Sequence, residues 1–162
     1  MERRVTDGGV TVLFIGGMGR SGSTLLDRVL GDVPGFVAVG ELVFLWRRGL
    51  ALGERCGCGE PFGRCAFWNR VGKEAFDGWD SIDVSALEAL QRRVDRNRFV
   101  PWMLAPKITP RAWRRDLDRY AEVLGRLYRG IAAASGAEVV VDSSKHASTA
   151  ELMRRVPGVE AR

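Results

Sequence analysis

A glycine-rich stretch directly after an apolar run constrains the fold of this chain more than any other feature. Residues 10–15 read Val-Thr-Val-Leu-Phe-Ile, and residues 16–24 read Gly-Gly-Met-Gly-Arg-Ser-Gly-Ser-Thr. This pattern predicts a buried strand, a tight turn and the first turn of a helix. Successive N–H groups of such a turn converge on an anion, and the positive end of the helix dipole adds to their attraction. The predicted binding residues of this glycine loop are Gly17, Met18, Gly19, Arg20, Ser21, Gly22, Ser23 and Thr24.

The spacing of the glycine loop nearly matches the P-loop motif GxxxxGK[ST], with one difference. Gly17 and Gly22 take the glycine positions and Thr24 takes the hydroxyl position, but Ser23 replaces the lysine. That lysine normally reaches the β- and γ-phosphates of a nucleoside triphosphate. Its absence argues against ordinary ATP or GTP hydrolysis and favours a different phosphorylated ligand. The alternative is a turn whose glycines serve only the backbone geometry.

Length and composition limit the classes of protein to which the chain can belong. Its 162 residues suffice for one domain with a hydrophobic core and are too few for two. The net charge is +5, but no basic run is interleaved with aromatic residues, so we predict no nucleic-acid partner. No stretch approaches the ~18 apolar residues of a membrane span. The first residues lack the apolar core of a signal peptide, so we expect a cytoplasmic location, and the oligomeric state stays open.

Apolar spacing and helix-breaking residues divide the chain into alternating helices and strands. We expect strands at 10–15, 36–39 and 138–142, and helices at 22–30, 42–52, 66–76, 85–97, 111–135 and 149–156. Three prolines make residues 99–110 an expected loop, and Ser85 with Glu88 forms an expected capping box. Strands separated by helices predict an α/β fold with a P-loop-type parallel sheet flanked by helices. The chain is then one domain, residues 1–162, with a helical, cysteine-containing insertion at about 42–110.

Three polar clusters follow the ends of the expected strands, at residues 16–24, 40–41 and 142–146. Because ligands bind beyond the carboxyl ends of parallel strands, we expect these clusters to meet at one site. Within the first cluster, the Arg20 guanidinium is suited to hold two oxygens of a phosphate or sulfate at once.

Glu41 and Lys145 are the candidate catalytic side chains of the other two clusters, together with Arg20. A Glu41 carboxyl buried without a partner has a raised pKa and accepts a proton from a hydroxyl nucleophile. Its alternative role is that of an acid at a helix N-terminus. Lys145 is placed to neutralise charge on a departing phosphate. In the alternative, Asp142 and Ser143 cap the next helix, and His146, the sole histidine, is structural.

Cys56, Cys58 and Cys65 allow three interpretations: a metal site, a loop disulfide or free thiols. The Cys-x-Cys spacing is tighter than the usual spacing of zinc ligands, and no second pair or nearby histidine completes four ligands. Three cysteines also cannot all pair with one another. We therefore assign no metal ligands and expect no metal in this chain.

Residues 15–26, Ile-Gly-Gly-Met-Gly-Arg-Ser-Gly-Ser-Thr-Leu-Leu, strongly resemble the 5′-phosphosulfate loop of one enzyme family. This family is the sulfotransferases that use 3′-phosphoadenosine 5′-phosphosulfate (PAPS), and the resemblance is closest to the bacterial and tyrosylprotein branch. The resemblance implies that Glu41 is the base for the acceptor hydroxyl. It further implies that Lys145, in Val-Asp-Ser-Ser-Lys, stabilises the bridging oxygen and the transferring sulfuryl group. The acceptor class stays open, and no metal takes part.

The family pattern continues past the last helix into a further strand, whose end holds the 3′-phosphate of the donor. Residues 157–162 are expected to stop just short of that strand, which makes the chain a truncated N-terminal part with an open sheet edge. Each lost charge-assisted hydrogen bond costs roughly 1.5–3 kcal/mol, so we expect weak or absent catalysis from these residues alone. The alternatives are a P-loop small-molecule kinase, with Asp142 binding magnesium, and a non-catalytic nucleotide-binding remnant.

Overall fold

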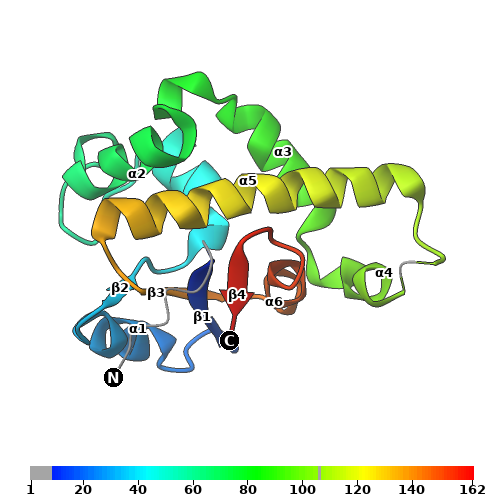
Figure 1. Cartoon of the computed structure of the whole chain (residues 1–162), viewed down its shortest axis with the longest axis horizontal. Helices are drawn as coiled ribbons and strands as arrows, with labels where there is room; N and C mark the ends of the chain where they lie inside the picture. The colour runs from blue at the N-terminus through cyan, green and yellow to red at the C-terminus, as the bar shows by residue number, and fades with distance from the viewer. Residues whose placement is uncertain (1–8, 106) are drawn as a thin grey trace.

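Four parallel strands form one sheet, in the spatial order β2-β3-β1-β4 (Figure 1). The computed structural model describes residues 9–105 and 107–162. The strands are β1 (Val10–Gly16), β2 (Phe36–Ala38), β3 (Val139–Lys145) and β4 (Val159–Ala161). Helices precede or follow each strand, so the parallel α/β class predicted from the sequence is confirmed.

Helices cover the sheet and build a second layer above it. They are α1 (Ser23–Gly31), α2 (Ala66–Phe76), α3 (Val84–Val94), α4 (Val100–Leu104), α5 (Arg111–Ser135) and α6 (Ala147–Met153). Short 3₁₀ turns lie at 42–44, 62–64, 79–81 and 97–99, and a π-helix spans Leu45–Ala51. Figure 1 shows α5 crossing above the strands, α2 and α3 above α5, and α1 below the strands. No helix in the described part of the chain has both the length and the apolar character needed to cross a bilayer.

Helix α5 organises the core because its apolar residues recur at helical spacing. Leu117, Leu124, Leu127 and Ile131 are all buried on it. The Trp46 indole N–H donates to the Tyr120 hydroxyl at 3.0 Å, which satisfies two buried polar groups at once. The expected helix at 111–135 is therefore confirmed.

Two sequence expectations about the helical layer are wrong. Residues 99–110 are not wholly a loop, because α4 begins at Val100 with Pro101 in its first turn, where proline costs no hydrogen bond. Pro106 lies outside the described residues. Asp83 caps α3 in place of the expected Ser85–Glu88 capping box, since its carboxylate accepts the Ala86 N–H at 2.9 Å.

The end of β3 and the last segment of the chain also differ from expectation. Strand β3 continues to Lys145 and His146 takes the N-cap position of α6 without a side-chain hydrogen bond, so neither Asp142 nor Ser143 caps that helix. The chain does not stop short of a further strand: residues 159–161 form β4 beside β1, and the Arg162 N–H donates to the Val12 carbonyl at 2.9 Å. Residues 42–51 are helical as expected, but in 3₁₀ and π geometry.

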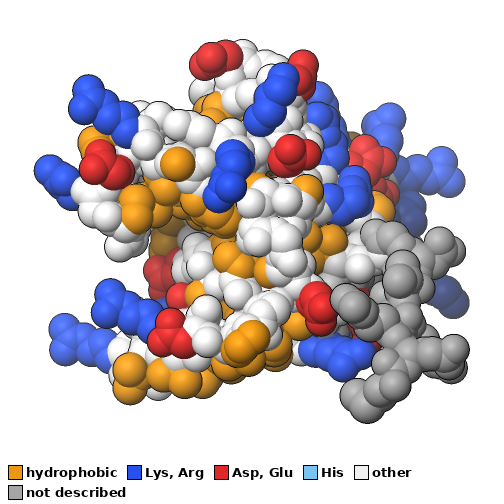
Figure 2. Space-filling view, turned by 60° about the vertical axis from the view of Figure 1, so that its left-hand side comes forward, with side chains coloured by type: hydrophobic (Ala, Val, Ile, Leu, Met, Phe, Trp, Pro, Cys, Tyr) orange, Lys and Arg blue, Asp and Glu red, His pale blue; other side chains and the backbone are white. Residues whose placement is uncertain are grey.

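Helix α1 turns its polar side toward the sheet and its apolar side outward. Its buried residues are Ser23 and Asp27, whereas Leu25 is 69% and Val29 is 56% exposed. Figure 2 shows hydrophobic side chains gathered along the lower edge of one face of the molecule. A surface helix usually turns its apolar side toward the core, so the orientation of α1 is the reverse of the usual one. It brings polar groups of α1 under the ends of the strands.

Helices α2 and α5 approach each other closely at a glycine of α5. A Cβ added to Gly130 would lie 2.6 Å from the Ala75 Cβ and 2.9 Å from the Ala75 backbone nitrogen. We expect Gly130→Ala to lower the free energy of unfolding by about 1–3 kcal/mol, because the two helices must move apart. Denaturant unfolding checks this. Gly63→Ala is the matched control, since its Cβ meets no atom within 4 Å, and equal midpoints for the two variants would contradict the close packing.

Candidate active site

The glycine loop joins β1 to α1 at the carboxyl edge of the sheet. Gly22 is the N-cap residue of α1 in the left-handed region (φ 78°), and residues 17–22 are exposed. The first helical hydrogen bonds run from the Leu25 and Leu26 N–H groups to the Gly22 carbonyl, at 3.0 and 3.2 Å. The N–H groups of Ser23 and Thr24 thus precede the first helical hydrogen bond, as at helix N-termini that bind anions.

Side chains of the glycine loop divide into those that fix its shape and those that face solvent. A Cβ at Gly17 would lie 3.1 Å from the Ser21 hydroxyl oxygen, so the Ser21 side chain folds back over Gly17. Ser23 occupies the position of the P-loop lysine and is buried, whereas Arg20 and Thr24 are exposed. Arg20 is thus the cationic side chain of this loop, and solvent reaches it.

Glu41 and Lys145 form an ion pair at the end of the neighbouring strands. Glu41 follows β2 and Gly40, and Lys145 is the last residue of β3. The side chains of Lys145 and Glu41 are 14% and 35% exposed. The Gly17 N–H points at the Lys145 carbonyl, 3.4 Å away, so the glycine loop and the ion pair lie together. Glu41 therefore has a cationic partner, which the sequence did not reveal.

A β-bulge directs Lys145 into this site. Phe14 of β1 lies opposite Asp142 of β3, but Gly16 lies opposite Lys145, so β3 contains one extra residue between these pairs. Bulges of this kind redirect a side chain and are frequent beside active sites.

Backbone strain is concentrated at the two candidate cations. Among the described residues, the non-glycine positions with positive φ are Arg20 (65°), Lys145 (67°) and Asp77 (65°). Asp77 ends helix α2, which is an ordinary place for this conformation. At Arg20 and Lys145 no helix end explains it, and such strain costs about 1–3 kcal/mol per residue. Strained residues of this kind cluster at functional sites.

Asp142 is fully buried behind the site, and both of its carboxylate oxygens are occupied. One oxygen accepts the Tyr128 hydroxyl at 2.6 Å, and the other accepts the Ser144 N–H at 2.9 Å and the Ser144 hydroxyl. The Leu42 N–H adds a longer contact of 3.4 Å. Asp142 therefore connects β3 to α5 and to the residue after Glu41. Its oxygens are not open for the magnesium ion that the kinase alternative requires.

Asp27 is a site residue that the sequence did not single out. It is buried on α1, and burial raises its pKa, while hydrogen bonds from Ser143 and Gly40 and the charge of Lys145 lower it. One of its carboxylate oxygens has no hydrogen-bond partner among the described residues. The only available signal was its spacing of four residues from Ser23, which puts both side chains on one helix face.

A cavity of about 430 Å³ is lined partly by residues that closely follow Glu41 and Lys145 in the sequence. Its lining residues are Val43, Phe44, Arg47, Glu88, Gln91, Arg92, Asp95, Arg96, Asn97, Arg98 and His146. His146 directly follows Lys145, and its ring packs edge-on against Phe44, with ring centroids 6.3 Å apart. Four arginines against two acids make the lining basic. The sequence analysis did not predict this cavity.

Burial raises the pKa of Asp142 from 3.8 to about 6, so this group opposes folding once it is ionised. Below about pH 4 the Asp142 carboxyl is protonated in both the folded and the unfolded chain, and above about pH 6 it is charged in both. We expect the free energy of unfolding of Asp142→Asn, relative to the native chain, to rise by about 3 kcal/mol between pH 4 and pH 7. Denaturant unfolding of both proteins across this range measures it, and a pH-independent difference would refute the assignment.

Comparison with known proteins gave no match: no family model, no curated protein and no solved structure matches this chain. The resemblance of residues 15–26 to a 5′-phosphosulfate loop therefore stays a prediction from the sequence. The chemistry of the site has to be inferred from the residues that meet there: the glycine loop, Arg20, the ion pair of Glu41 with Lys145, and the basic cavity.

Proposed function

We propose that this chain is a PAPS-dependent sulfotransferase that transfers a sulfuryl group to a hydroxyl acceptor. The observation that supports the proposal is that the glycine loop, which lacks the P-loop lysine, lies next to the ion pair of Glu41 and Lys145. A loop of this kind suits a donor that has a 5′-phosphosulfate and no γ-phosphate. The ion pair supplies one group that can accept a proton and one that can neutralise a leaving phosphate.

The glycine loop binds the 5′-phosphosulfate of the donor in this proposal. Backbone N–H groups at the start of α1 donate to the phosphate, and the helix dipole favours its charge. Arg20 is exposed at the loop and donates to two oxygens at once. Its left-handed backbone supports this role, because strain of this kind is retained where a side chain must be held in position.

Sulfuryl transfer then requires one proton transfer and one exchange of S–O bonds. The acceptor oxygen forms a bond to sulfur while the bond from sulfur to the bridging phosphate oxygen breaks. The acceptor proton moves to the Glu41 carboxylate, and the electron pair of the broken bond leaves with the 5′-phosphate. Lys145 stabilises the charge that develops on that phosphate, so neither step demands a metal ion.

The ion pair also suggests an order of events. Without a donor, Lys145 neutralises Glu41. A bound phosphosulfate gives Lys145 a second anionic partner, and Glu41 becomes a freer acceptor for the proton. Donor binding thereby prepares the base for the acceptor.

The basic cavity is the proposed place of the acceptor. Its residues Val43 and Phe44 follow Glu41 closely, and His146 directly follows Lys145, so the lining continues from the segments that carry both catalytic side chains. The four arginines favour an acceptor that carries a negative charge near its hydroxyl group.

The two rival functions make different demands on ligands. A small-molecule kinase needs magnesium-dependent ATP binding, and the occupied oxygens of Asp142 argue against it. A non-catalytic remnant would bind adenosine 3′,5′-bisphosphate without transferring sulfate. Calorimetry with ATP and magnesium, and separately with adenosine 3′,5′-bisphosphate, discriminates between the kinase and the other two functions. Sulfate transfer from labelled PAPS then discriminates the enzyme from the remnant.

Arg20→Ala should weaken binding of adenosine 5′-phosphosulfate by about 10- to 100-fold. The reason is the loss of charge-assisted hydrogen bonds worth roughly 1.5–3 kcal/mol. Calorimetry measures the affinity. Arg119→Ala, which removes an exposed arginine of α5, is the matched control and should bind as the native chain does. Equal affinities for both variants would remove Arg20 from the donor site.

Glu41→Gln and Lys145→Met should change donor affinity in opposite directions. Glu41→Gln frees Lys145 for the donor phosphate and should tighten binding about two- to fivefold, the range of a partly exposed ion pair. Lys145→Met should weaken it. Wherever transfer is measurable, Glu41→Gln should also lower the turnover by about 10²- to 10⁴-fold through loss of the base. Weakened binding in both variants would show that the pair only maintains the fold.

A further inference from the structure

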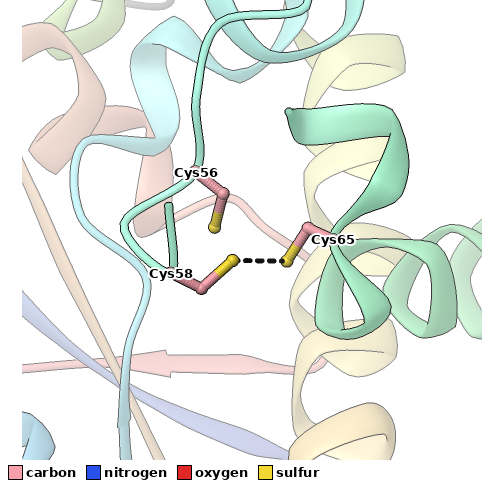
Figure 3. Close-up of side chains that lie close together, drawn as sticks. All are labelled: Cys56, Cys58 and Cys65. Atoms are coloured by element: carbon pink, nitrogen blue, oxygen red, sulfur yellow. Dashed lines mark hydrogen bonds between the residues drawn. The ribbon is translucent and has the colours of Figure 1, made fainter. Parts of the chain in front are cut away.

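Three cysteine thiols converge at one point outside the proposed active site (Figure 3). Cys56 and Cys58 lie on a tight turn, and Cys65 directly precedes α2. Their sulfur atoms all lie within 4.8 Å of one another, and the Cys58 and Cys65 sulfurs are 3.7 Å apart. Figure 3 shows the three side chains pointing toward a common centre from two separate segments.

The surrounding backbone holds the three thiols together, with a hydrogen bond between Cys58 and Cys65 and no disulfide among them. The Cys56 N–H donates to the Glu60 carbonyl at 2.8 Å, and the Gly59 N–H donates to the Cys56 carbonyl at 2.9 Å, which closes the turn. Phe62 anchors the segment in the core, because its buried ring stacks on Trp68 with centroids 5.2 Å apart. The convergence is therefore a property of the fold and not of flexible side chains alone.

The sulfur positions fit a metal better than they fit a disulfide. A zinc ion with Zn–S bonds of about 2.3 Å in tetrahedral geometry separates its sulfur ligands by about 3.8 Å. The separation of the Cys58 and Cys65 sulfurs, 3.7 Å, is close to this value. A disulfide would bring two sulfurs to about 2.05 Å and leave the third thiol without a role.

We propose that Cys56, Cys58 and Cys65 bind one Zn²⁺ ion as three thiolates, with the fourth coordination position open to solvent. Cys65 is buried, Cys56 is half-buried and Cys58 is exposed, so the open position faces outward on the side of Cys58. No metal was predicted from the sequence, because no further cysteine pair or histidine near the three cysteines completes four ligands. Three converging ligands with solvent as the fourth satisfy the coordination number without a further residue.

Charges around the cluster favour this assignment. Three thiolates and Zn²⁺ have a net charge of −1, and the N-terminus of α2, with Cys65 at its N-cap, presents its positive dipole end to them. Arg55 lies in the same turn and donates to the Gly59 carbonyl at 2.8 Å. Because zinc binds the thiolate form of cysteine, its affinity should fall as the pH is lowered.

A metal at this point would fasten the segment at 53–65 to the start of α2. Within that segment Phe62 and Cys65 are the buried residues, so its position depends on few apolar contacts. A ligand that binds the folded chain and not the unfolded one stabilises the fold by mass action. The proposed zinc ion would therefore stabilise this segment, and it involves no residue of the glycine loop or of the ion pair.

The test uses the whole chain, reduced and freed of metal, with Zn²⁺ and Co²⁺ as probes. We expect one equivalent of Zn²⁺ to bind, and one equivalent of Co²⁺ to give the absorption bands of thiolate-bound cobalt. Cys58→Ser should lower the Zn²⁺ affinity by about 100-fold or more. Its exposed position means that it folds as the native chain does, which circular dichroism checks. Glu60→Gln is the matched control and should bind normally, since its carboxylate is not among the converging ligands.

Three results would overturn the proposal: no metal bound by the reduced native chain, full affinity in Cys58→Ser, or cobalt bands without thiolate character. A further contrary result is a disulfide in the protein as isolated, shown by alkylation of a single thiol before reduction and of three after it. Since none of these measurements uses the sulfate donor, failure here is separable from failure of the proposed sulfotransferase activity.

Discussion

The buried carboxylate of Asp142 connects the parts on which the rest of the site depends. It accepts hydrogen bonds from α5 through Tyr128, from its own strand through Ser144, and from the segment that begins at Leu42. A carboxylate can satisfy all of these donors because it has two acceptor oxygens. Through these bonds Asp142 links the segment after Glu41 to strand β3, which ends at Lys145. Glu41 and Lys145 thus depend on a buried carboxylate whose oxygens are already occupied.

The candidate site at the carboxyl edge of the sheet is built from segments that are far apart in the sequence. Glu41 and Lys145 are 104 residues apart, yet the parallel pairing of β2 with β3 brings their strand ends side by side. The glycine loop reaches the same place because β1 pairs with β3 on its other side. The central position of β3 in the sheet therefore explains why three distant segments share one site.

Much of this arrangement follows from patterns along the chain, and the rest depends on tertiary partners. The periodicity of α5 and the polar residues after strand ends predicted the long helix, the parallel class and the juxtaposed clusters. The inward side of α1 was not predictable, because burial of Asp27 depends on groups of β3 and Gly40 rather than on helical spacing. The meeting of Cys65 with Cys56 and Cys58 likewise depends on Phe62 packing against Trp68. The fourth strand was missed because three residues carry too weak a pattern.

The bulge in β3 has a consequence for how this chain can vary. Loss of one residue between Asp142 and Lys145 would restore regular alternation with β1 and turn the following side chain to the opposite face of the sheet. The ion pair would then be lost although every side chain type was retained. The site therefore depends on the number of residues between Asp142 and Lys145 as well as on their side chains.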